Sequence, residues 1–258
     1  MRDLSSYAFS PLRDGDLTLY RGSGEGLPPI LLVAAENNSL GCLTRLEHEY
    51  FLRADLDAAW AAHPIELSRH RNRLALVLED PGGAVLDRLV GRPLEITEFL
   101  RIGISLARAL RQVHARGLIH KDIKPANILA DLASGSAWLT GFGIASRLPR
   151  ERPNLEPPHE IAGTLAYMAP EQTGRMNRSI DARSDLYSLG VTFYQMLTGM
   201  LPFTAADPME WLHCHIARQP VPPDERTGGN PQGSIAHHHE APRQDRGGAL
   251  PDRRGCRG

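Results

Sequence analysis

The sequence predicts an α+β fold, with short strands up to about residue 80 and helices beyond it. Short apolar runs, separated by turns rich in glycine and proline, indicate the strands. Longer segments with apolar residues every three or four positions indicate the helices. The 258 residues are enough for one large or two-lobed domain, and an apolar content of 41% is ordinary for a globular protein.

The strands begin with a hairpin. Leu17–Arg21 and Ile30–Ala34 are apolar runs on either side of residues 22–29. The three glycines between these runs indicate a plain turn rather than a phosphate-binding loop. Two further strands are predicted at residues 65–67 and 74–78.

Four helices follow from apolar periodicity. The first runs from Leu40 to Asp55, and the clearest runs from Thr97 to Arg116, where Gly117 ends it. The clearest helix has two apolar stripes, one formed by Leu100, Ile104, Ala107, Leu110 and His114 and the other by Phe99, Ile102, Leu106, Ala109 and Val113. The others span residues 179–197 and 206–217, and the expected buried face of the former is Leu186, Leu189, Gly190, Phe193 and Leu197.

The segment 118–129 carries an acid, a base and an amide at fixed offsets, namely Asp122, Lys124 and Asn127. It resembles the catalytic loop of serine/threonine protein kinases, in which the Asp takes the proton of the attacking hydroxyl and the Asn holds a metal ion. The alternative is a polar turn between two short strands. The resemblance implies a two-lobed protein kinase-like fold, incomplete at the C-terminus, with a β-rich N-lobe at 1–80 and a mostly helical C-lobe at 81–223.

The same resemblance assigns roles to other positions. It implies that Gly15, Leu78, Glu79, Asp80 and Asn127 contact the nucleotide, and that Asn127 also binds the metal. Residues 147–159 resemble an activation loop. Structural roles are implied for seven residues, which are Glu49, His120, Phe142, Gly143, Thr164, Glu171 and Asp185.

Three positions depart from an active kinase. Gly15 is the only glycine of the nucleotide loop at 12–17, Val33 stands where the family has a phosphate-binding lysine, and Gly141 replaces the metal-binding Asp. Phosphoryl transfer depends on positioning and charge neutralisation, so weak binding of ATP and Mg²⁺ and impaired catalysis are expected. On this basis Val33→Lys and Gly141→Asp together are expected to raise nucleotide and magnesium affinity more than either change alone, because both groups act on one ligand. The alternatives are a regulatory pseudokinase, an active serine/threonine kinase and a gene fragment without function.

The context of the domain is inferred from residues 171–181, which resemble the N-terminal kinase-like domains of large bacterial hybrid sensor histidine kinases. The resemblance implies a protein partner or substrate, namely other modules of a larger sensor. The net charge of -1 gives no electrostatic footprint for nucleic acid. No apolar run is long enough to span a membrane, and three scattered cysteines fit a cytoplasmic protein.

The last segment, residues 224–258, is dominated by Gly, Arg, His and Pro without apolar periodicity, and it is predicted to be disordered. A codon choice for residues 235–258, read one base later, encodes an amphipathic helix and an Arg-containing loop typical of the end of kinase domains. We infer a frameshift from it. A metal site at His237–Glu240 is not favoured, because no fold there fixes ligand geometry.

Overall fold

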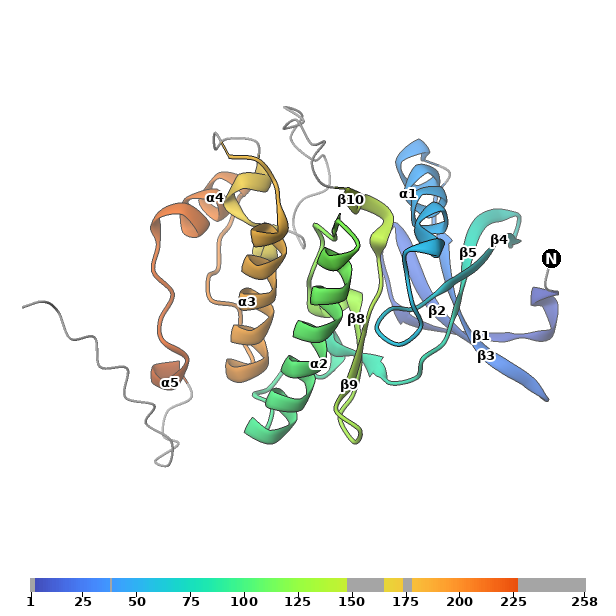
Figure 1. Cartoon of the computed structure of the whole chain (residues 1–258), viewed down its shortest axis with the longest axis horizontal. Helices are drawn as coiled ribbons and strands as arrows, with labels where there is room; N and C mark the ends of the chain where they lie inside the picture. The colour runs from blue at the N-terminus through green and yellow to red at the C-terminus, as the bar shows by residue number, and fades with distance from the viewer. Residues whose placement is uncertain (1–2, 38, 148–164, 174–177, 227–258) are drawn as a thin grey trace, which may run out of the picture. The chain divides into compact units, whose positions relative to one another are not determined.

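The computed structural model describes residues 3–37, 39–147, 165–173 and 178–226 (Figure 1). All of them lie in the first of two structural units, Met1–Gly228. Thr164, most of the expected activation loop, and the segment from residue 227 onward, with the inferred frameshift, lie outside the described residues. No helix in the described part is long and apolar enough to cross a membrane.

A five-stranded antiparallel sheet forms the N-terminal part. The predicted hairpin is present, but its strands are longer than predicted, so the turn consists of Glu25 and Gly26 alone. The strand order is β1-β2-β3-β5-β4. The strands are β1 (Ala8–Arg13), β2 (Leu17–Gly24), β3 (Leu27–Ala35), β4 (Pro64–His70) and β5 (Arg73–Glu79).

The first strand, β1, was not predicted, and part of it was assigned to the nucleotide loop. Pro11 interrupts its pattern, since proline cannot donate to a sheet. The structure tolerates Pro11 because β1 is an edge strand that pairs only with β2. The loop that follows is therefore short, and Arg13 is the last residue of the strand rather than a loop residue.

Helix α1 (Leu40–Phe51) covers one face of the sheet. The Ser39 side chain accepts a hydrogen bond from the Cys42 backbone N–H and so caps its start. The predicted helix continued to Asp55, whereas residues 52–54 form a tighter 3-10 turn. The chain then contacts the later part, where the backbone N–H groups of Ala62 and Leu139 donate to Leu139 and Trp60 carbonyls at 3.0 Å each.

The later part is mainly helical, as the α+β prediction required. Its small strands form a three-stranded sheet in the order β6-β8-β9 and a two-stranded pair of β7 and β10. The strands are β6 (Ala84–Val85), β7 (Leu118–Ile119), β8 (Ile128–Asp131), β9 (Ser136–Leu139) and β10 (Ser146–Arg147). The helices are α2 (Ile96–Ala115), α3 (Ala182–Thr198), α4 (Pro208–Ala217) and α5 (Pro223–Arg226), the last of which includes three residues predicted to be disordered.

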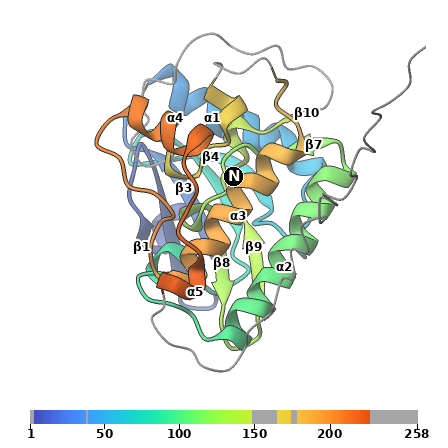
Figure 2. The ribbon, with the colours of Figure 1, turned by 90° about the vertical axis from the view of Figure 1, so that its left-hand side faces the viewer.

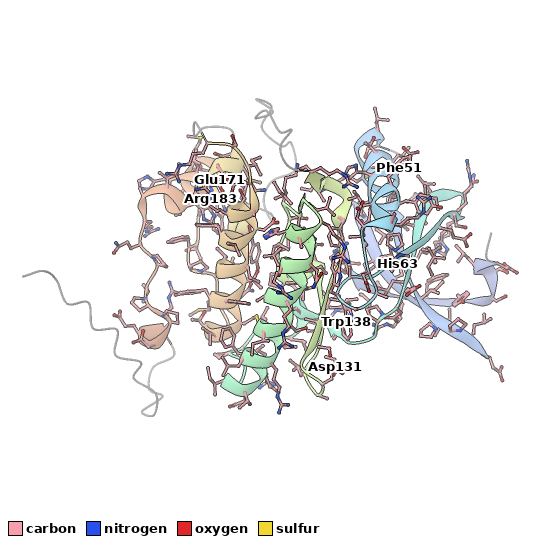
Figure 3. All side chains as sticks on the ribbon, viewed as in Figure 1. Phe51, His63, Asp131, Trp138, Glu171 and Arg183 are labelled. Atoms are coloured by element: carbon pink, nitrogen blue, oxygen red, sulfur yellow. The ribbon has the colours of Figure 1, made fainter. Side chains whose placement is uncertain are left out.

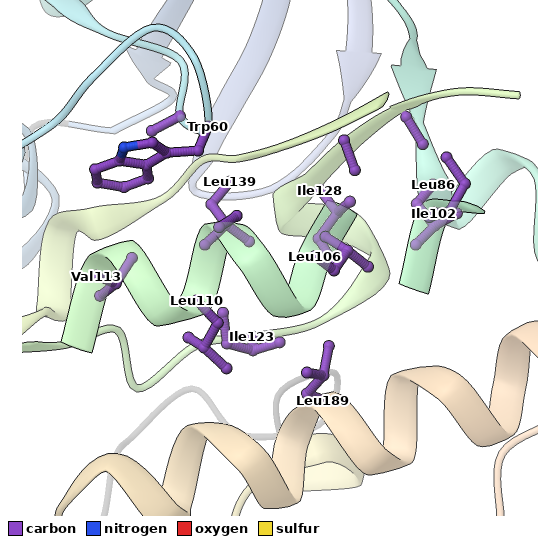
Figure 4. Close-up of a cluster of buried hydrophobic side chains, with 14 of the residues drawn as sticks. Trp60, Leu86, Ile102, Leu106, Leu110, Val113, Ile123, Ile128, Leu139 and Leu189 are labelled. Atoms are coloured by element: carbon purple, nitrogen blue, oxygen red, sulfur yellow. The ribbon is translucent and has the colours of Figure 1, made fainter. Parts of the chain in front are cut away.

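Helix α2 buries most of one predicted stripe and only part of the other. Ile102, Leu106 and Val113 of the second stripe pack in the main hydrophobic cluster (Figure 4). Leu100 and Ile104 of the first stripe are 51% and 52% exposed while Leu110 of the same stripe is buried, so the prediction of a wide buried face was wrong in part. The reason is that β9 and α3 pack against a single side of the helix.

Helix α3 lies between α2 and the segment of α4 and α5 (Figure 2). Its predicted apolar face was wrong in part, because Leu186 is 55% exposed while Ser188 and Thr192 are buried. The hydroxyls of those two residues donate to the carbonyls four residues earlier, at 3.2 and 3.0 Å. A hydroxyl that has a hydrogen-bond partner can be buried at little cost in free energy. A search for apolar periodicity does not find such buried polar residues.

Candidate active site

The side chain of Asp185, which is fully buried in α3, holds the segment between β7 and β8 in place. Its two oxygens accept the backbone N–H groups of His120 and Lys121 at 2.9 and 2.8 Å. His114 Nε2 lies 2.9 Å from the same carboxylate. Lys121 adopts the left-handed conformation with φ of 67°, so these bonds hold a turn that a lysine seldom forms.

The fixed turn brings the acid, the base and the amide together. Lys124 Nζ lies 2.9 Å from Asp122 Oδ1. The Asn127 amide donates from Nδ2 to Asp122 Oδ2 at 2.7 Å and to the Asp122 carbonyl at 2.9 Å. The Asp122 carboxylate is therefore held in one orientation, as a group that accepts a proton must be.

His120 lies under this group as a buried core residue. Its Nδ1 accepts the Asp122 backbone N–H at 3.2 Å, so Nε2 carries the proton and donates to the Thr140 carbonyl at 3.1 Å. The ring packs against Phe142, with the centroids 4.5 Å apart. Burial lowers the pKa of His120, which favours the neutral ring that this bonding pattern needs.

These groups face a cleft of about 950 Å³. The sequence-predicted residues that line it are Gly15, Glu49, Asp122, Lys124, Asn127 and Gly143, together with the substituted positions Val33 and Gly141. Leu78, Glu79 and Asp80 are not among the lining residues. Leu78 is fully buried in the sheet, and Asp80 forms a two-pronged ion pair with Arg21 at 2.6 and 2.9 Å.

Gly141 has no room for a side chain. Its φ is 80°, and a Cβ atom there would lie 2.9 Å from Cγ and from Oδ1 of Asn127. The Asn127 amide thus packs where the side chain of residue 141 would begin. This geometry works against the expectation that Gly141→Asp simply adds a metal ligand, because the new side chain would displace the Asn127 amide.

Arg13 is a site residue that the sequence reasoning missed. From the end of β1, its Nη1 donates to the Ala126 carbonyl at 2.9 Å and to Asn127 Oδ1. Burial lowers the pKa of Arg13, and the charges of Asp122 and Glu49 oppose that shift. The available signal was an arginine inside residues 12–17, the stretch expected to form the nucleotide loop.

Glu49 and Arg45 enter the cleft from α1. Glu49 accepts the Gly141 backbone N–H at 3.2 Å and is 2% exposed. Burial raises its pKa, while backbone N–H groups and the charges of Arg13 and Arg45 reduce the rise. Arg45 lines the cleft and forms no ion pair with any described residue.

Two other predicted residues have structural contacts. Glu171 lies in a 3-10 turn at Pro170–Thr173, and its Oε1 accepts the hydroxyl of Ser184, near the start of α3, at 2.6 Å (Figure 3). Glu171 is only partly buried, so its carboxylate needs a partner less than a carboxylate in a buried ion pair does. A Cβ atom on Gly143 would lie 2.9 Å from Cβ of Arg45, so α1 packs here against bare backbone.

A magnesium ion does not fit the donors of this cleft. Mg²⁺ requires several oxygen ligands in nearly ideal octahedral geometry. Both Asp122 oxygens are hydrogen-bonded, Asn127 Oδ1 faces a guanidinium, and residue 141 has no side chain. Among the described residues, no group of three or more His, Cys, Asp or Glu is placed to hold a metal. By contrast, the buried Thr140 hydroxyl lines the cleft without a hydrogen-bond partner.

Comparison with known proteins identifies a family model and relatives that match this chain. A model of the protein kinase domain matches residues 43–228. The chain is 40% identical over 151 residues to the serine/threonine-protein kinase Pkn1 of Myxococcus xanthus, which covers 57% of this chain and 21% of that protein. It is 35% identical over 156 residues to the serine/threonine-protein kinase PknB of Mycobacterium leprae, covering 60% and 24%. The match thus spans about a fifth to a quarter of the length of these relatives.

Proposed function

Because this chain belongs to the protein kinase domain family, we propose that it is a nucleotide-binding regulatory domain whose phosphoryl transfer is impaired. Domains of this family generally use ATP and Mg²⁺. In this chain the groups that would handle the phosphates and the metal differ from that general pattern, whereas the acid and base of the catalytic segment are present.

The single observation that carries the proposal is the contact between Arg13 and Asn127. In the family the amide oxygen of this Asn binds a metal ion. Here that oxygen accepts a hydrogen bond from a guanidinium, which repels a second cation. Val33 and Gly141 remove the other cation and the other metal ligand from the same cleft.

The expected loss of rate is large. A correctly placed base such as Asp122 contributes about 10²–10⁴-fold on its own. Each missing electrostatic donor at a reacting group costs about 3–4 kcal/mol, by analogy with oxyanion donors. Two such losses exceed what the base supplies, so transfer is expected to be close to background.

A second candidate is an active serine/threonine kinase, and the geometry around Asp122 favours it. Its carboxylate is oriented by Lys124 at 2.9 Å and by the Asn127 amide at 2.7 Å. In that case Asp122 accepts the proton of a serine or threonine hydroxyl, and Lys124 offsets negative charge on the transferred phosphoryl group.

The cellular role is proposed from the family context. We propose a cytoplasmic domain of a bacterial signalling protein, with other modules of a larger hybrid sensor as its partners. Leu78, Glu79 and Asp80 are proposed to face the adenine ring through the backbone, since Leu78 and Glu79 end β5 and Asp80 follows them at the exit from the sheet. Their absence from the cleft lining means that a bound nucleotide would extend beyond the 950 Å³ volume.

The test combines binding and transfer. Calorimetry with ATP is expected to show binding, and radiolabelled ATP is expected to transfer phosphate to a generic protein substrate at the rate of an Asp122→Asn variant. Asp131→Asn is the control, because this residue ends β8 (Figure 3) and is not among the residues that line the cleft. Transfer that is lost in Asp122→Asn and kept in Asp131→Asn would support the active kinase. An absence of ATP binding would overturn both candidates.

A further inference from the structure

Arg13 holds the position of a cation inside the cleft. Its guanidinium reaches from the edge strand β1 to the Ala126 carbonyl and to Asn127 Oδ1, which are 113 and 114 residues away. Among the described residues, Nη2 makes only a weak third bond, to the Leu17 carbonyl at 3.5 Å. A guanidinium has five N–H donors, so part of its fork remains for a ligand.

Charged side chains around Arg13 influence whether its guanidinium stays protonated. Burial lowers the pKa of Arg13 and the charge of Arg45 adds to that shift, whereas the charges of Asp122 and Glu49 oppose it and favour the charged form. Arg45 adds a second guanidinium to the same cleft without an ion pair among the described residues. Three arginines, Arg13, Arg45 and Arg88, therefore line a cleft in which Val33 supplies no cation, and no group of three or more His, Cys, Asp or Glu among the described residues is placed to hold a metal.

Resting on the proposed nucleotide binding, we propose that Arg13 is the built-in cation of the phosphate site and replaces the metal ion, with Arg45 as the second phosphate contact. Guanidinium groups bind phosphate oxygens with charge-assisted, often two-pronged hydrogen bonds. The nucleotide then binds without a divalent cation. The unpartnered Thr140 hydroxyl in the same cleft offers a further polar contact.

The mouth of the cleft limits the strength of this binding. Asp14, Asp16 and Asp87 also line it and carry charges that oppose a polyphosphate. We therefore expect modest affinity that depends on Arg13, rather than tight binding driven by overall charge. The dependence on one named residue is what separates this site from a merely basic surface.

The test measures ATP affinity of the full chain by calorimetry, in excess EDTA and in excess magnesium. The expected result is the same affinity in both buffers. Arg13→Ala is expected to weaken binding in EDTA by about tenfold or more, the worth of a charge-assisted hydrogen bond. Arg13→Lys, which keeps the charge, is expected to recover part of the loss. Arg69→Ala is the matched control, since this exposed arginine lies on β4 of the same sheet and outside the cleft lining.

Each outcome decides between the two proposals. Binding that requires magnesium, or that is unchanged in Arg13→Ala, overturns the role of Arg13 and leaves the nucleotide-binding function standing. No ATP binding in either buffer overturns the proposed function, and sodium tripolyphosphate in EDTA then tests the cation site alone. Tripolyphosphate binding that is lost in Arg13→Ala supports the site, and no binding overturns it. Circular dichroism and thermal melting of each variant, with Arg13→Lys as the milder change, separate lost binding from lost folding.

Discussion

The carboxylate of Asp185 accepts the backbone N–H of His120 across 65 residues of chain. The same side chain accepts the N–H of Lys121, whose left-handed backbone begins the turn that presents Asp122. One fully buried group on α3 therefore fixes the geometry of the catalytic segment.

Asp185→Ala is expected to destabilise the protein by about 3–5 kcal/mol, because two backbone donors and His114 lose a buried acceptor. Urea unfolding measures the change. Asp181→Ala is the control at the same helix, where an exposed N-cap side chain accepts the Arg183 N–H and is worth about 1 kcal/mol. Equal losses in the two variants would contradict the role of Asp185.

Gly141→Ala is expected to cost more stability than Gly26→Ala. Both glycines have positive φ, of 80° and 70°, so each substitution meets the left-handed penalty of about 1–2 kcal/mol. A Cβ atom on Gly26 meets nothing within 4 Å, whereas one on Gly141 meets the Asn127 amide. The difference between the two free energies of unfolding isolates that contact.

Asn127→Ala provides the second arm of this experiment. In its background the excess cost of Gly141→Ala is expected to shrink, because the space next to residue 141 is then open. A double-mutant cycle by urea unfolding gives the coupling energy. If the two changes simply add, the amide does not exclude a side chain at residue 141, and Gly141→Asp becomes a plausible route to a metal ligand.

Glu49→Gln is expected to make stability less dependent on pH. Burial raises the folded-state pKa of Glu49 above its ordinary value of 4.5. The folded state therefore holds its proton more tightly, and the stability contributed by Glu49 is present below pH 4.5 and is lost as pH rises through the higher folded pKa. The variant is thus expected to gain on the wild type as pH increases from 4.5 toward neutrality.

Urea unfolding at a series of pH values checks this expectation. Glu47→Gln is the control, because this glutamate lies on the same helix and is exposed. The opposite trend, in which Glu49→Gln becomes relatively weaker toward neutral pH, would mean that Arg13 and Arg45 stabilise the carboxylate more than burial destabilises it.

The ion pair of Arg21 and Asp80 is expected to show a coupling energy of about 1–3 kcal/mol in a double-mutant cycle. Its two short bonds and the 3% exposure of the Asp80 side chain reduce solvent screening. The pair of Arg73 and Glu36 is the comparison, since both side chains are 45% exposed and such pairs contribute at most about 1 kcal/mol. Similar coupling energies for the two pairs would show that the ion pair linking β2 to Asp80, the residue after β5, is weak.

Local patterns in the sequence were enough to predict most of the fold. Apolar runs located four of the five strands of the main sheet, and periodicity located α1 to α4. Errors arose where the position of a residue in the folded protein, rather than its local sequence, determines whether that residue is tolerated. Pro11 is acceptable only because β1 lies at an edge, and the buried Ser188 and Thr192 are acceptable because their own helix satisfies the hydroxyls.

The candidate site was predictable only where its residues are close in sequence. Asp122, Lys124 and Asn127 lie within six positions, and the structure brings them together. The contact of Arg13 with Asn127 spans 114 residues, and no spacing rule connects them. The packing of Asn127 against Gly141 depends on the left-handed backbone of Gly141. Glycine permits that conformation but does not require it, so the sequence alone does not predict the contact.

The distance along the chain between Arg13 and Asn127 also has a consequence for biosynthesis. At translation rates of about 5–20 residues per second, Arg13 leaves the ribosome on the order of 10 s before its partner is made. During that interval the edge strand carries an arginine without its acceptors, and the chain crossing at Leu139 is also incomplete. Both contacts therefore form only after the nascent chain has passed residue 139, and a chain stalled earlier on the ribosome lacks the link at Leu139 between the sheet and the later part.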